Sequence, residues 1–154
     1  MDTVVSAIKL ESFSIDHTHM PAPNVRKAGI SNGPKGDTVS KFDLRFMKPN
    51  TDTIPTAALH TLEHLLSTYM RNYLDGIIDL SPMGCRTGFY LSIWDDVSLE
   101  TIANALKKSL KDILTTAWSE VPGISERECG NWRDHSLFAA QEYARQVLRG
   151  LEGA

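Results

Sequence analysis

The feature that most constrains this chain is a helical segment carrying two histidines and a glutamate in the order His60-Thr61-Leu62-Glu63-His64. The segment begins near Pro55 and ends at Gly76, and its apolar residues recur every three or four positions, which predicts an amphipathic helix. These apolar residues are Ala58, Leu59, Leu62, Leu65, Leu66, Tyr69, Met70 and Tyr73. At about 100° per residue, both histidines and the glutamate fall on the side away from the apolar stripe. The helix therefore buries one side and presents these three side chains on the other.

The rest of the chain predicts antiparallel strands and separate helices, which together indicate an α+β fold with the sheet packed against the helices. The expected strands cover 24–31, 38–48, 77–80 and 88–94, with the first two joined as a hairpin by the turn residues 32–37. Ser98 begins a helix that reaches Ala117, and a last helix covers 137–151. The capping-box spacing of Ser125 and Glu128 predicts a short helix that ends at Cys129.

Length and composition set the class of protein. A chain of 154 residues predicts one domain over 1–154, with residues 1–10 as an N-terminal arm. The net charge of −3 argues against a basic nucleic-acid-binding domain. The sequence shows neither a signal peptide nor an apolar run long enough to span a bilayer, so we expect a cytoplasmic protein with reduced thiols that binds neither nucleic acid nor membrane.

The helix face and one cysteine predict a metal site. Because residues four apart share a helix face, His60 and His64 can hold one ion. Cys129 would add a thiolate, giving three protein ligands and an open position, as in catalytic sites. The alternatives are an ordinary solvated helix face and a small buried cysteine. Cys85 lies in the turn between two expected strands, where a nearby dication would favour its thiolate, or else it is a packing residue.

Five ordered blocks of residues resemble the S-ribosylhomocysteine lyase (LuxS) family. The blocks are Glu11-Ser12-Phe13 with Asp16-His17, Lys41 to Phe46, His60 to Leu66, Asp79 to Gly88, and Glu128-Cys129-Gly130. They run from about residue 11 to the last helix, which is nearly the whole chain.

The resemblance implies cleavage of S-ribosylhomocysteine to homocysteine and 4,5-dihydroxy-2,3-pentanedione, the precursor of autoinducer-2. It implies one divalent metal per chain, Fe(II) with Zn or Co able to substitute, and a homodimer with active sites at the interface. By position, His60, His64 and Cys129 resemble the family's metal ligands, and Cys85 and Glu63 resemble its acid/base pair. Ser12, His17, Arg45 and Asp79 resemble its substrate-binding residues.

Two other functions use the same residues. One is a zinc peptidase, because inverzincins carry H-x-x-E-H on a helix with the glutamate as general base. Such enzymes take a carboxylate as the third ligand and have longer chains, whereas this chain offers Cys129. The other is a non-catalytic zinc-stabilised domain, which needs a fourth protein ligand. His135 is the nearest candidate for that ligand.

Overall fold

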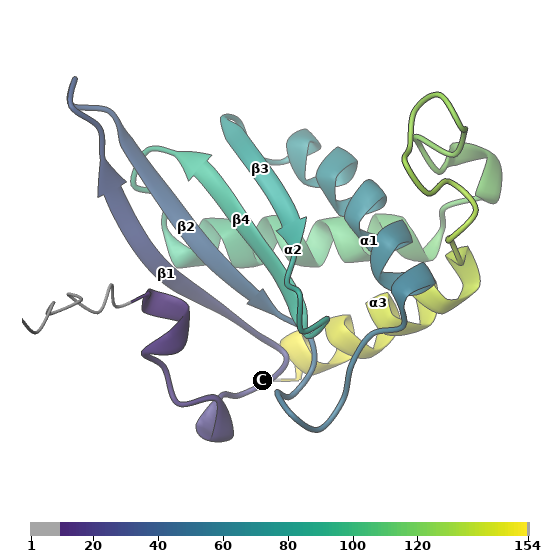
Figure 1. Cartoon of the computed structure of the whole chain (residues 1–154), viewed down its shortest axis with the longest axis horizontal. Helices are drawn as coiled ribbons and strands as arrows, with labels where there is room; N and C mark the ends of the chain where they lie inside the picture. Colours follow the sequence, from purple (N-terminus) through teal and green to yellow (C-terminus); the bar gives the residue numbers. More distant parts are fainter. Residues whose placement is uncertain (1–9, 154) are drawn as a thin grey trace, which may run out of the picture.

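In the computed structural model, which describes residues 10–153, four strands form one antiparallel sheet in the order β1-β2-β4-β3 (Figure 1). The strands are β1 (Asn24–Asn32), β2 (Thr38–Arg45), β3 (Ile77–Pro82) and β4 (Gly88–Trp94). The helices are α1 (Thr56–Tyr69), α2 (Leu99–Leu114) and α3 (Leu137–Glu152), and short 3-10 turns η1 to η4 cover Glu11–Phe13, His17–His19, Met70–Asn72 and Trp118–Glu120. The structure confirms the expected α+β class.

The two faces of the sheet differ in what covers them. On β2 and β4 alternate residues point to opposite faces, and the pairs Leu44–Phe89 and Phe42–Leu91 are fully buried against the helices. The opposite face carries Asp43, Arg45 and Tyr90. No helix covers this second face in Figure 1, where α2 passes behind the strands and only the N-terminal turn η1 lies near β1.

The helices α2 and α3 begin at serine caps, and α1 buries the apolar stripe that its periodicity predicts. The Ser98 hydroxyl accepts from the Thr101 amide at 3.2 Å and begins α2, and the Ser136 hydroxyl does the same for Ala139 in α3. Leu62, Leu65 and Leu66 of α1 are fully buried, as the apolar stripe predicts. Among residues 10–153, no helix has both the length and the apolar character needed to cross a bilayer.

The structure differs from the expected elements at several points. The helix that begins at Ser98 ends at Leu114 rather than reaching Ala117, which is exposed. The helix expected to end at Gly76 ends at Tyr69 and is followed by the 3-10 turn η3. Ser125–Glu128 forms a single hydrogen-bonded turn rather than a helix, with the Cys129 amide donating to the Ser125 carbonyl at 3.0 Å. The Ser125 hydroxyl still bonds the Glu128 carboxylate and amide, but Gly130 follows at once and one turn cannot propagate. The second strand ends at Arg45, since the amides of residues 46 and 47 turn to the Thr87 carbonyl. Residues 1–9 of the expected arm lie outside the described range.

Candidate active site and metal centre

The loop over 115–136 folds onto the polar side of α1 and orients its two histidines. A backbone carbonyl only accepts hydrogen bonds, so each histidine donates from Nδ1: His60 to the Asp134 carbonyl at 2.9 Å and His64 to the Pro122 carbonyl at 2.8 Å. Gly123, at φ +72°, permits this approach, because a Cβ there would lie 3.1 Å from the His64 ring. In neutral rings both Nε2 atoms then keep a free lone pair, which is the arrangement that metal-ligating histidines use.

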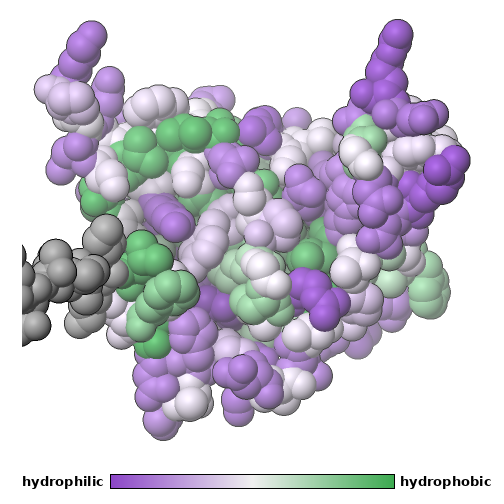
Figure 2. Space-filling view, viewed as in Figure 1, coloured by the Kyte–Doolittle hydropathy of each residue, from purple (hydrophilic) through white to green (hydrophobic). Residues whose placement is uncertain are grey.

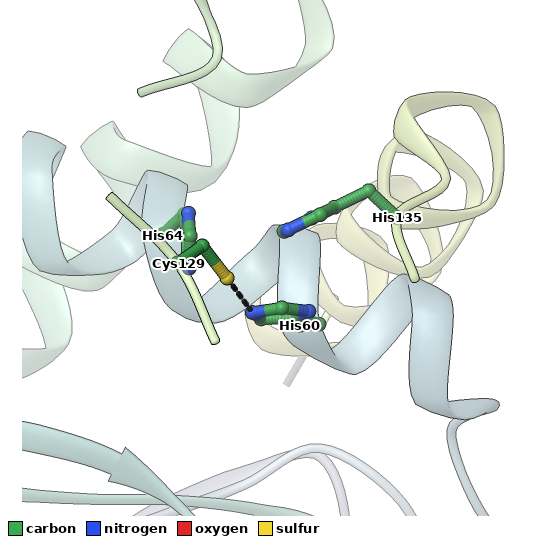
Figure 3. Close-up of side chains that lie close together, drawn as sticks. All are labelled: His60, His64, Cys129 and His135. Carbon is green, nitrogen blue, oxygen red and sulfur yellow. Dashed lines mark hydrogen bonds between the residues drawn. The ribbon is translucent and has the colours of Figure 1, made fainter. Parts of the chain in front are cut away.

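Cys129 brings a sulfur atom to these two nitrogens. Its Sγ lies 3.3 Å from Nε2 of His60, and it comes from the turn after Ser125 (Figure 3). The donor atoms of His60, His64, Cys129 and His135 all lie within 4.8 Å of one another. Two imidazole nitrogens and a thiolate are ligands that Zn²⁺ and Fe²⁺ accept, so the residues present fit a divalent transition metal.

His135 adds a fourth donor atom to this cluster. Its ring stacks on that of His60, with centroids 3.8 Å apart, and its Nδ1 lies 3.0 Å from the Thr61 hydroxyl. That hydroxyl donates to the Ala57 carbonyl, so it accepts from Nδ1 and leaves Nε2 without a proton. Nε2 is buried and has no hydrogen-bond partner among the described residues, and Figure 3 shows it pointing toward the cluster. Desolvation, then the nearby His60 and His64, lower the pKa of His135 to about 4.

This pKa gives a testable stability profile for the metal-free protein. An unfolded histidine titrates near 6.5, whereas folded His135 titrates near 4, so between these values the unfolded state binds more protons. The free energy of unfolding should therefore fall as the pH drops from about 6.5 toward 4. Urea unfolding at several pH values measures this, and His135→Gln should show a shallower decline. Equal slopes for the two proteins would contradict the assignment.

Glu63 precedes His64 on α1, and its carboxylate is not among the donor atoms that cluster with His60, His64, Cys129 and His135. It is partly exposed, and its carboxylate makes no hydrogen bond within residues 10–153. Its partial exposure contrasts with the full burial of Leu62, the residue before it, which belongs to the apolar stripe. A carboxylate without fixed partners is available to exchange protons with a bound molecule.

Cys85 is presented by a tight turn between β3 and β4. The Met83 amide donates to the Gly88 carbonyl and the Arg86 amide to the Met83 carbonyl, both at 2.9 Å. Gly88 lets β4 start against β2, since a Cβ there would collide with the Leu44 carbonyl oxygen. Cys85 itself is exposed and forms no disulfide with Cys129, as the sequence predicts.

Two neighbouring cavities bring most of the other predicted residues together. One of about 390 Å³ is lined by Ser12, Phe13, His17, Arg45, Pro82, Met83, Gly84, Cys85 and Tyr90. The other, of about 170 Å³, is lined by His17, Arg45, Pro49, Asn50, Thr53, Cys85 and Thr87. Asp79 lies on β3, where it accepts a hydrogen bond from Ser81, and it lines neither cavity. The metal cluster residues and Glu63 also lie outside both linings.

Arg45 is not the solvated strand residue that its position alone suggests. It is 2% exposed, and it donates to Asp43 at 2.7 Å and to Thr87 at 2.8 Å. Asp43 and Thr87 were not predicted as site residues. A signal for Asp43 did exist, because a carboxylate two residues from an arginine on a strand shares its face.

Comparison with known proteins identifies the family. The model of the S-ribosylhomocysteinase (LuxS) family matches residues 10–153. The S-ribosylhomocysteine lyase of Clostridioides difficile (strain 630) is 56% identical over 140 residues, covering 91% of each chain. That of Ligilactobacillus salivarius (strain UCC118) is 52% identical over 140 residues, covering 91% of this chain and 90% of the relative. A match over nearly the whole chain, together with the clustered histidines and cysteine, places this protein in the LuxS family.

Proposed function

We propose that this protein is a metal-dependent lyase that cleaves S-ribosylhomocysteine to homocysteine and 4,5-dihydroxy-2,3-pentanedione, the autoinducer-2 precursor. The main support for the proposal is that His60, His64 and Cys129 lie close together in a member of this family. Both histidines donate from Nδ1, which leaves their Nε2 atoms available to a metal. The direct test is to measure homocysteine release from S-ribosylhomocysteine by purified, metal-loaded protein. No release under these conditions would contradict the proposal.

One divalent ion per chain would be held by His60, His64 and Cys129, with one position left for water or substrate. The expected ion is Fe(II), with Zn or Co able to replace it. When bound, it supplies Lewis acidity toward the sugar oxygens. His135 brings a fourth donor atom to the same cluster. The family resemblance implies three protein ligands, so we propose that His135 stacks on His60 beside them.

Cys85 and Glu63 are proposed to carry the protons. The thioether of the substrate leaves only when a carbonyl stands one carbon away from the proton to be lost. The ribose carbonyl therefore migrates along the sugar, and each migration removes a proton from one carbon and returns it to another through an enediol. A thiolate and a carboxylate on different elements can serve adjacent carbons and oxygens. The final step breaks the carbon–sulfur bond and releases homocysteine.

Ser12, His17, Arg45 and Asp79 are proposed to bind the substrate. The first three share cavity walls with Cys85, which supports a binding role for them. The positive charge of Arg45 is already partly balanced by Asp43, and its guanidinium forms part of both cavities. Asp79 is exposed on the same sheet face as Arg45, because their strands keep alternate residues on one side.

We also propose a homodimer whose interface completes the site. Cys85 lines a cavity with Ser12, His17 and Arg45, and the metal cluster is not part of its walls. A second copy placed on this face would bring its metal cluster to that cavity. Within residues 10–153 no α-helix covers the sheet face that bears Arg45, and Figure 2 shows apolar patches between polar ones on this side.

The dimer should be visible both in mass and in activity. Sedimentation at working concentration should give twice the chain mass. Because each site would combine two chains, mixing Cys85→Ser chains with His60→Ala chains, both nearly inactive alone, should restore a measurable fraction of wild-type activity. Each variant mixed with itself is the control. An active monomer, or no recovery in mixtures shown to contain heterodimers, would contradict the arrangement.

A cytoplasmic location is proposed on the chemistry of the cysteines. Both Cys85 and Cys129 are free thiols, and both functions assigned to them need a reduced sulfur.

The two alternative functions, a zinc peptidase and a non-catalytic zinc-stabilised domain, use the same helix. Neither accounts for the cavity that places Cys85 beside Arg45.

A further inference from the structure

A chain of buried polar contacts runs from the sheet to Cys85. Arg26 and Arg45 both donate to Oδ2 of Asp43, at 2.9 and 2.7 Å. Arg45 also donates through Nη1 to the Thr87 hydroxyl oxygen at 2.8 Å, and this oxygen lies 3.0 Å from Sγ of Cys85. Asp43, Arg45 and Thr87 are each 2% exposed or less. Buried charged and polar side chains thus lie directly behind the Cys85 thiol in the cavity wall.

The contact from Arg45 determines which way the Thr87 hydroxyl points. A guanidinium only donates, so the hydroxyl oxygen must accept from Arg45 and direct its own proton elsewhere. Among residues 10–153, the other hydrogen-bonding atom within reach of that hydroxyl is Sγ of Cys85. Thr87 is 2% exposed, so water is a poor alternative acceptor. When the sulfur is ionised it has no proton to donate, so the hydroxyl of Thr87 donates to Sγ of Cys85.

The backbone around Thr87 keeps this geometry in place. Its carbonyl accepts from the amides of Phe46 and Met47, both at 2.9 Å, and Gly88 brings the next residue against β2. A thiolate accepts such a hydrogen bond more strongly than a thiol, because bonds to an ionised acceptor are the stronger ones. The nearby guanidinium adds a positive charge on the same side.

We propose that Thr87 is a positioning residue for Cys85: its hydroxyl, oriented by buried Arg45, donates to Sγ, holds the sulfur at the cavity wall and favours the thiolate. The proposal rests on the acid/base role assigned to Cys85. In that role the sulfur must be ionised when it removes a proton and must stay in one place while it does so. Thr87 supplies both conditions from the wall of the smaller cavity.

The test compares Thr87→Val, which removes the hydroxyl at nearly constant shape, with Thr87→Ser, which keeps it. The rate of Cys85 alkylation by iodoacetamide is followed by peptide mass spectrometry over pH 5–9 in metal-loaded protein, with Cys129 in the same digest as internal reference. Thr87→Val should react roughly 10-fold more slowly near neutral pH. Thr87→Ser should restore the wild-type profile. The kcat should follow the alkylation rate while KM changes little.

Unchanged alkylation of Cys85 in folded, metal-replete Thr87→Val would overturn the proposal, as would failure of Thr87→Ser to restore it. Alkylation does not require turnover. If Cys85→Ser stays fully active, the assigned catalytic role fails; if it is inactive while Thr87→Val alkylates normally, only the inference about Thr87 fails.

Discussion

Replacing Cys129 with alanine is expected to reduce the metal content from about one equivalent per chain to near zero. In the proposed site the thiolate is one of three protein ligands, and His60 and His64 alone would form an incomplete site on a single helix face. Activity should disappear with the metal. Metal analysis of protein purified without oxygen, followed by dialysis against a mild chelator, measures the loss.

Two matched variants separate ligation from other effects. Cys85→Ala removes the other thiol, and His135→Gln changes the ring that stacks on His60. Both should keep one equivalent of metal after the same dialysis. If Cys129→Ala retained its metal, Cys129 would not be a ligand. Loss of the metal from His135→Gln instead would make His135 a fourth ligand and favour a closed, structural site.

The elements that the sequence predicts well are those whose signals are local. The period of α1, the serine caps of α2 and α3, and the turn residues between β1 and β2 are each contained in a short window. The His60–His64 pair is equally local, because helix geometry alone puts residues four apart on one face. These features do not depend on how distant segments meet.

The features that the sequence does not predict arise from contacts between distant segments. The loop over 115–136 has no periodicity, so nothing local indicates that its Pro122 and Asp134 carbonyls orient His64 and His60. The burial of Arg45 likewise depends on Asp43 and on Thr87 from another strand. The capping-box signal at Ser125 was real, but it made one turn because Gly130 follows.

Glu63→Gln and Cys85→Ser are each expected to lower kcat by roughly 10²-fold or more, with the metal content unchanged. Glutamine keeps the size and hydrogen bonding of Glu63 but cannot accept the proton. Serine keeps the shape of Cys85, and its contact with Thr87, but it is a far weaker acid than a thiol. Steady-state kinetics and metal analysis on the same preparations measure both quantities.

The division between kcat and KM distinguishes proton carriers from groups that only hold the substrate. If Cys85 and Glu63 merely positioned the sugar, these changes would raise KM and spare the chemical step. As proton carriers they should also slow the incorporation of solvent deuterium into the substrate, because the first carbonyl migration already moves a proton. His17→Ala is the matched comparison, since His17 lines the same cavity as Cys85 and should act mainly on KM. A Cys85→Ser enzyme with near-normal turnover and deuterium exchange would show that the turn between β3 and β4 presents a packing residue and that another group carries the proton.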